Sequence, residues 1–186
     1  MTNLLPKSLL AALFFTGSAA LAQDTETASD LNLGEPVGPE LYVKDIIGSW
    51  EVQCINVAEG PERCQMNQRL MGPGGNQIAE ISIFPVNDGG EAVAGATIAV
   101  PLMTALNQPL LIAVDDSVPR QYPYSVCNPQ FCVAQVGFRV QEVEAFKEGT
   151  MGIIAITAFE APQDGPIMIE MPLDGFTAAF EAINGE

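Results

Sequence analysis

The chain has 186 residues, of which 23 are acidic and 7 are basic, and its formal net charge is −16. This balance excludes nucleic acid as a partner and disfavours anionic membrane surfaces, because binding to phosphates rests on lysine and arginine. The chain contains no histidine. That absence removes the Ser-His-Asp and Cys-His catalytic arrangements and the usual ligands of catalytic zinc.

Residues 1–22 have the pattern of a secretory signal peptide. Lys7 supplies a positive charge, residues 9–15 are apolar, and Ala20 and Ala22 are the small residues that a signal peptidase reads. We therefore expect cleavage after Ala22 and a protein that is periplasmic or secreted. The apolar stretch is shorter than the roughly 20 residues that span a membrane, and no later stretch is apolar enough. The mature chain is therefore expected to have no membrane span.

Residues 23–44 are predicted to be a flexible acidic lead-in. They are rich in aspartate and glutamate and show no hydrophobic periodicity, a composition that cannot bury enough apolar surface to fold. Residues 45–186 are then predicted to form one domain, since their length suits a single hydrophobic core.

From residue 49 onward, short apolar runs alternate with turns rich in glycine and proline. Trp50, Val52 and Cys54 alternate with polar residues, which is the period of a strand with one buried face. Gln68 falls on the inner face of the next predicted strand, where its amide needs partners and can tie the sheet to a loop. The predicted strands are residues 49–55, 64–70, 78–86, 97–100, 110–114, 122–127, 132–139, 150–159 and 166–171.

Two segments have helical rather than strand spacing. Residues 140–146 carry apolar side chains three apart and precede a glycine stop signal. Residues 174–183 place apolar side chains at i, i+4 and i+7, and Asp174 is their predicted N-cap. We expect one short terminal helix. Many short strands without βαβ alternation indicate an antiparallel sandwich or barrel.

The four cysteines form two close pairs in the sequence, Cys54 with Cys64 and Cys127 with Cys132. In an oxidising compartment such pairs predict disulfides. We favour the local pairings because one turn can close each of them, although a long-range pairing such as Cys54 with Cys127 stays open. A redox or zinc site is disfavoured, because neither pair has the two-residue spacing of those motifs.

Catalytic motifs are sparse. No phosphate-binding glycine loop is present, and no cofactor is expected. Asp115 and Asp116 follow an apolar strand, where a glycosidase acid or a calcium ligand could lie. The simpler interpretation is a polar turn after that strand.

Seven short sequence motifs follow one another in a characteristic order along the chain. The pieces are Gly48-x-Trp50-x-Val52-x-Cys54, Cys64-x-Met66-x-Gln68, Pro101-Leu102, Leu111 to Asp115, Tyr124-x-x-Cys127-x-x-x-x-Cys132-x-Ala134, Lys147-x-Gly149 and Asp174-Gly175-Phe176. Together, over roughly residues 45–183, the chain resembles the invasion-associated locus B (IalB-like) family. The resemblance implies an exported, all-β, immunoglobulin-like antiparallel β-sandwich of bacterial origin, here with a short C-terminal helix. The family's activity is undefined, so the resemblance supplies no catalytic residues.

The chain departs from the family pattern in two loops. Members commonly have glycine just before the last cysteine, where this chain has Phe131. Members usually carry glycines after the position of Pro101, where this chain reads Leu-Met-Thr-Ala-Leu-Asn-Gln-Pro over residues 102–109. Both departures change loops, and with them any binding role of those loops.

These observations favour a non-enzymatic exported module of the bacterial envelope that acts through protein–protein contact. Tyr122, Tyr124 and Phe131 are the predicted contact patch, because aromatic side chains are favoured in interfaces. The partner is an unknown protein of the envelope or the cell exterior. The alternatives are a carboxylate-dependent hydrolase built on Asp115 and Asp116, and a periplasmic module that binds a small ligand or a cation.

Overall fold

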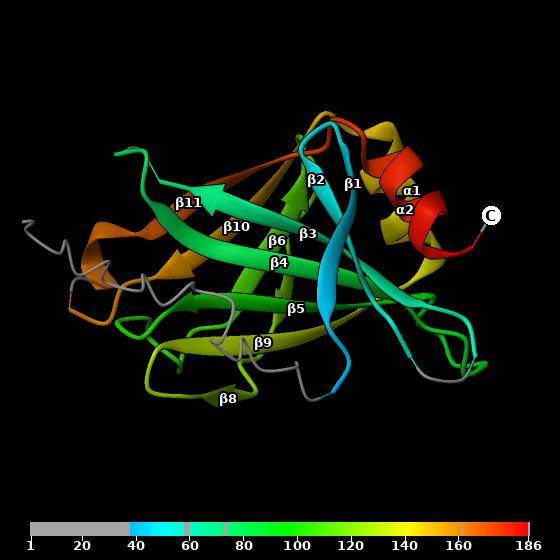
Figure 1. Cartoon of the computed structure of the whole chain (residues 1–186). Helices are drawn as coiled ribbons and strands as arrows, with labels where there is room; N and C mark the ends of the chain where they lie inside the picture. Colours follow the sequence, from blue (N-terminus) through cyan, green and yellow to red (C-terminus); the bar gives the residue numbers. More distant parts are fainter. Residues whose placement is uncertain (1–37, 58–59, 73, 161, 186) are drawn as a thin grey trace, which may run out of the picture. The chain divides into compact units, whose positions relative to one another are not determined.

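Eleven strands in two antiparallel sheets form the body of the described chain (Figure 1). The computed structural model describes residues 38–57, 60–72, 74–160 and 162–185. The strands are β1 (Leu41–Ile47), β2 (Trp50–Ile55), β3 (Arg63–Met71), β4 (Gln77–Pro85), β5 (Ala94–Pro101), β6 (Leu110–Val114), β7 (Arg120–Tyr122), β8 (Val126–Cys127), β9 (Phe131–Phe138), β10 (Met151–Thr157) and β11 (Pro166–Pro172). The helices are α1 (Val140–Glu148), the 3-10 turn η2 (Pro162–Asp164) and α2 (Phe176–Ile183).

The larger sheet has the strand order β1-β2-β3-β4-β5-β9-β8, and the smaller has the order β11-β10-β6-β7. Alternate side chains of both sheets enter one core. Trp50, Val52 and Cys54 are buried on β2, as their alternation predicts, and Ile154 and Ile169 come from the smaller sheet. The predicted antiparallel sandwich with a short C-terminal helix is therefore confirmed. The predicted signal peptide and most of the predicted lead-in lie outside the described residues.

The two helices lie side by side at one end of the sheets, as Figure 1 shows. An aromatic cluster joins them to the core. The ring centroids of Phe146 and Phe176 lie 5.3 Å apart, and Trp50 meets Phe176 edge-on at 5.4 Å. Such edge-on pairs add to the stabilisation that area burial alone provides.

Two glycines bring the ends of the domain together. Gly48 and Gly175 both have positive φ, 58° and 79°, and their backbones are in contact. A Cβ on Gly175 would lie 3.0 Å from the Gly48 Cα and closer still to the Ile47 carbonyl oxygen. The Ser49 N–H donates to the Asp174 carbonyl oxygen over 3.1 Å. Only glycine suits both the backbone conformation and the close approach.

Gln68 ties the larger sheet to the smaller one. Its Nε2 donates to the carbonyl oxygens of Ser49, over 3.1 Å, and of Pro172, over 3.0 Å. The predicted inward amide is therefore confirmed. The second acceptor belongs to β11, so the tie joins two sheets as well as a sheet and a loop.

Three details of the prediction are wrong. Strand β1 begins at Leu41, so residues 41–44 belong to a strand and not to a lead-in. Residues 122–127 are not one strand, because β7 and β8 belong to different sheets, and Pro123 between them has no N–H to continue a ladder. Asp174 does not cap α2. Gly175 occupies the N-cap in a left-handed conformation, with no side-chain cap.

The segment at residues 140–148 is the helix that its spacing predicts. The Glu142 carboxylate accepts the backbone N–H of Arg139 over 3.0 Å, which satisfies a donor that would otherwise stay unpaired at the helix start. None of the helices in the described ranges has the length and apolar content that a membrane crossing requires.

Candidate interaction surface

Six large apolar side chains gather at the end of the sandwich where β10 runs into β11. Each is between 43% and 68% exposed. They are Leu102, Met103 and Leu106 of the β5–β6 loop, Phe159 after β10, and Ile167 and Met168 of β11. Met168 lies on the outer face of β11, whereas Ile167 lies on the same face as the buried Ile169, at the exposed end of the strand. We call these six residues the apolar surface. In Figure 1 the β10–β11 connection lies at the opposite end of the sheets from the helices.

Backbone hydrogen bonds fix the β5–β6 loop against the end of β10. The Phe159 N–H donates to the Met103 carbonyl oxygen, and the Ala105 N–H donates to the Thr157 carbonyl oxygen, both over 2.8 Å. Thr104 is buried, and its hydroxyl donates to the Pro101 carbonyl oxygen over 2.8 Å. Because Thr104 and Ala105 point inward, the larger side chains of Leu102, Met103 and Leu106 are left exposed to solvent. These hydrogen bonds hold the backbone beneath them, which we call the backbone frame.

The register of the smaller sheet extends this apolar character along β10. Met168 pairs with Ala155, which in turn pairs with Leu111 of β6. The outward side chains of these three strands are apolar in this row, which ends at Gln121 of β7. In the next row Ile153 pairs with Ala113 on one side and with Glu170 on the other. The outer face of an antiparallel sheet is ordinarily polar. β10 is apolar on both faces, which is the pattern of a strand that is covered on both sides.

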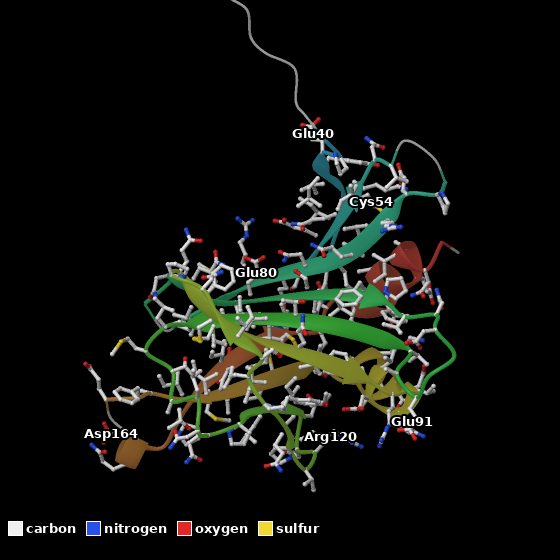
Figure 2. All side chains as sticks on the ribbon, turned by 90° about the horizontal axis from the view of Figure 1, so that it is seen from below. Glu40, Cys54, Glu80, Glu91, Arg120 and Asp164 are labelled. Atoms are coloured by element: carbon white, nitrogen blue, oxygen red, sulfur yellow. A yellow bond between two sulfur atoms is a disulfide. The ribbon has the colours of Figure 1, made fainter. Side chains whose placement is uncertain are left out.

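Three carboxylates belong to the same segments as Phe159 and Met168, and the segments that carry the apolar surface contain no base. Glu160 follows Phe159, Asp164 lies in η2, and Glu170 is two residues beyond Met168 on the same face of β11. None of the ion pairs among the described residues includes these three acids. Neither residues 101–119 nor residues 148–186 contain a lysine or an arginine. Figure 2 shows Asp164 well apart from Arg120.

A separate cavity of about 230 Å³ lies between β6, β7 and α1. Its walls are mostly apolar, and a polar cluster stands at one side. The Tyr122 hydroxyl donates to Glu142 Oε1 over 2.5 Å, and the Arg120 Nε lies 3.4 Å from the same oxygen. Burial, the hydrogen bond to Glu142 and the charge of Glu142 together raise the pKa of Tyr122 above its usual value. The cavity is the size of a small organic molecule.

The three residues of the predicted contact patch do not form one cluster. Tyr122 packs edge-on against Phe138 at the end of β9, with 6.3 Å between ring centroids. Phe131 begins β9 and pairs with Pro101. The two aromatic positions are thus separated by the length of β9, roughly 23 Å at about 3.3 Å per residue. Tyr124 is half-buried against the core. Phe131 is 37% exposed, and its backbone lies next to the β5–β6 loop.

Both predicted disulfides are confirmed. Cys54 is bonded to Cys64 with 4.1 Å between Cα atoms, and Cys127 to Cys132 with 4.0 Å. Each pair is directly opposed in its antiparallel ladder, β2 with β3 and β8 with β9. Glu62 lies beside the first pair, but oxidised sulfurs offer no thiolate to a metal.

Asp115 stabilises a turn. Its φ is 47°, and its carboxylate accepts the backbone N–H groups of Thr150, over 3.1 Å, and Met151, over 3.0 Å. Asp116 is exposed beside it. The carboxylate that a hydrolase would use therefore joins the turn after β6 to the start of β10.

The chain matches the family model described as Invasion associated locus B (IalB) protein over residues 50–184. This chain belongs to the invasion associated locus B family. An invasion protein B homolog of Brucella abortus (strain 2308) is 26% identical over 134 residues, which are 72% of this chain and 75% of the homolog. A second homolog, from Brucella abortus biovar 1 (strain 9-941), shows the same identity and coverage.

The fold agrees with this membership. The crystal structure of invasion associated protein b from Bartonella henselae has a TM-score of 0.66 and 22% identity, and the match covers 76% of this chain and 94% of that one. The residues that carry the family pattern build the scaffold. Gly48 meets Gly175, Trp50 meets Phe176, and a Cβ on Gly149 would meet Val114 and Asp115.

The apolar surface has a different origin, and the sequence alone did not reveal it as a site. Leu102, Met103 and Leu106 fall in residues 102–109, the segment in which the resemblance predicts glycines and this chain has none. The available signal was the presence of large apolar residues in turns, together with a strand, residues 151–157, that is apolar at almost every position.

Proposed function

We propose that this IalB-family protein is an exported, non-enzymatic protein of the bacterial envelope, and that it acts by protein–protein contact through the apolar surface. One observation carries the proposal: six exposed apolar side chains stand on a backbone frame that is already hydrogen-bonded. A preformed frame lowers the ordering cost of binding, and contiguous apolar patches mark interaction sites.

Export is supported by two disulfides and by the signal-peptide pattern of residues 1–22. The protein is then periplasmic or secreted after cleavage at Ala22. A role in invasion belongs to the names of the relatives, and it is not part of the proposal. The non-enzymatic reading is supported by the absence of histidine and by the structural use of the Asp115 carboxylate.

The test is capture of envelope proteins on the immobilised, exported protein. The double variant Phe159→Ser/Met168→Ser removes two anchors, each worth about 1.5–3 kcal/mol if a partner buries it fully. We expect capture to fall at least about tenfold. The matched control is Val118→Ser/Ile46→Ser, which removes two apolar side chains that are 87% and 67% exposed elsewhere on the molecule. Equal loss of capture in both double variants would remove the support for this surface.

The predicted contact patch stays a prediction. Phe131 is its most accessible member, so Phe131→Ala tests the patch with little effect on folding. Tyr124→Ala would also remove core packing, and a loss of capture in that variant needs a check of the melting temperature. If Phe131→Ala abolishes capture while Phe159→Ser/Met168→Ser does not, the predicted patch replaces the apolar surface as the contact site.

A second candidate function is the binding of a small organic ligand in the cavity beside α1. Its apolar walls and the polar groups of Arg120, Tyr122 and Glu142 suit a molecule with one polar end. Thermal shift measurements with small organic acids and alcohols test it, with Phe146→Trp as the variant that fills the cavity. A ligand-dependent rise in melting temperature that Phe146→Trp abolishes would support this function. The hydrolase alternative requires turnover that depends on Asp115, which glycan hydrolysis assays on Asp115→Asn address.

A further inference from the structure

The negative charge near the apolar surface indicates which charge a binding partner would carry. Glu160, Asp164 and Glu170 stand beside the six apolar side chains, and none of them is in an ion pair within the described ranges. The segments that carry the apolar surface, residues 101–119 and 148–186, contain no lysine or arginine. Arg69 of β3 lines a pocket together with Glu170, but its guanidinium is paired with Glu51 over 2.6 Å. Charged side chains of any partner that buries this surface would therefore lie close to these three carboxylates.

We propose that the partner is a protein segment in which lysine or arginine side chains alternate with or flank apolar ones. This inference rests on the proposed contact function of the apolar surface. The apolar side chains of the segment cover Phe159, Met103 and Met168, and its cationic groups lie against Glu160, Asp164 and Glu170. Opposite charges at a rim steer association and reject partners of the wrong sign.

Two other occupants are disfavoured by the same charges. The segment at residues 23–37 carries Asp24, Glu26, Asp30 and Glu35 and no base, so its approach would place acid against acid. A second copy of the chain would bring the same three rim acids into a self-complementary interface. Like charges placed together in this way oppose association. A basic partner is the occupant that satisfies both the apolar and the acidic parts of the surface.

The experiment uses the exported protein and two short peptides, one of alternating leucine and lysine and one of alternating leucine and glutamate. Binding is followed by NMR titration of backbone amides. We expect the leucine–lysine peptide to shift amides of residues 102–106 and 158–170, with an affinity that weakens as salt rises. The leucine–glutamate peptide should bind at least about tenfold more weakly.

Charge variants separate local recognition from the general attraction of an acidic protein for a cation. Glu160→Gln/Glu170→Gln should weaken the leucine–lysine peptide about fivefold, since each exposed ion pair is worth up to about 1 kcal/mol. The control, Glu148→Gln/Glu181→Gln, removes the same charge from exposed positions on the helices and should change affinity less than about twofold. Phe159→Ser/Met168→Ser should abolish the local amide shifts.

Three results would overturn the inference: equal weakening by both charge variants, equal affinity for both peptides, or self-association in sedimentation that Phe159→Ser/Met168→Ser removes. The first result means diffuse attraction, the second an apolar contact without charge selection, and the third a second copy as the occupant. If envelope capture still depends on Phe159 and Met168 while the peptide preference is absent, the contact function stands and the charge inference fails.

Discussion

Gly48 and Gly175 show how single residues set the entry to the C-terminal helix. Both lie in the left-handed region. A Cβ on Gly48 would clash with the Asp174 backbone, and a Cβ on Gly175 would clash with the Ile47 carbonyl and approach the Gly48 Cα. Their contact brings Trp50 of β2 to Phe176 of α2. These residues therefore join the β1–β2 turn to the C-terminal helix.

Gly175→Ala should therefore destabilise the protein more than an ordinary glycine substitution. A left-handed alanine alone costs about 1–2 kcal/mol, and the clash with the Ile47 carbonyl adds to it. The control is Gly165→Ala, because Gly165 has a φ of 84° but open space around its Cβ position. We expect Gly175→Ala to lower the melting temperature at least about twice as far, measured by circular dichroism. Equal shifts would mean that the close contact contributes nothing.

Tyr122 and Tyr124 are both partly buried, but only the Tyr122 hydroxyl has a hydrogen-bond partner among the described residues. The Tyr122 hydroxyl donates to Glu142, whereas the Tyr124 hydroxyl is buried with no hydrogen-bond partner among the described residues. Burial raises the pKa of Tyr124 to about 12. The folded state therefore favours the neutral phenol of Tyr124. The contribution of this preference to the free energy of unfolding is fully present below the unfolded pKa of about 10. It is lost as pH rises from about 10 to 12, because the unfolded state releases the Tyr124 proton first.

Tyr122→Phe and Tyr124→Phe should accordingly have opposite effects. At pH 7, Tyr122→Phe removes a donor from a largely buried carboxylate and should cost about 1–2 kcal/mol. Tyr124→Phe removes only an unpartnered hydroxyl and should leave the protein at least as stable. It should also make stability fall less steeply between pH 10 and 12. Urea unfolding at pH 7 and across that alkaline range measures both effects. If Tyr124→Phe lowers the free energy of unfolding at pH 7, the Tyr124 hydroxyl does form a stabilising hydrogen bond and this prediction is wrong.

At the scale of elements, the disulfides fasten two hairpins. Each one joins residues that already face each other in an antiparallel ladder, so the bond restrains the unfolded chain more than it reshapes the folded one. Cys54–Cys64 spans a sequence separation of 10, and Cys127–Cys132 spans 5. The longer loop loses more entropy when it is closed.

Removing the first disulfide should therefore cost more stability than removing the second. Loop-closure entropy predicts about 2.8 kcal/mol for Cys54→Ala/Cys64→Ala and about 2.2 kcal/mol for Cys127→Ala/Cys132→Ala. The first variant also loses packing in the core, where Cys54 is fully buried. Urea unfolding of the two double variants gives the comparison. A larger loss in the second variant would show that the β8–β9 hairpin does more than close a loop.

Sequence periodicity predicted the elements whose side chains alternate between core and solvent. β2, β3 and α2 follow this rule, because Trp50, Met66 and Phe176 each lie at inward positions. β1 escaped prediction because it is an edge strand with most of its side chains exposed. The apolar surface was not predicted from the sequence, because the exposure of Phe159 and Met103 depends on which loops pack together. Neighbouring residues in the sequence do not encode that packing.

At the scale of the whole molecule, scaffold and contact surface occupy different places. Helices α1 and α2 lie at one end of the sheets, and the β10–β11 connection lies at the other (Figure 1). The glycine contact and the aromatic cluster belong to the helix end, because they include Gly175, Phe176 and Phe146. The formal net charge of −16 opposes contact between two copies of the chain. The same charge is the reason why we propose a basic, partly apolar partner for the apolar surface.

The most direct measurement is photo-cross-linking in intact cells, with a photoreactive phenylalanine analogue at one position at a time. The positions are Phe159 and Met168 on the apolar surface, Phe131 of the predicted patch, and Val118 and Ile46 as exposed controls. We predict a discrete cross-linked partner from Phe159 and Met168 and none from Val118 or Ile46. Cross-links from Phe131 alone, or equally from all five positions, would contradict the claim that the apolar surface is the contact site.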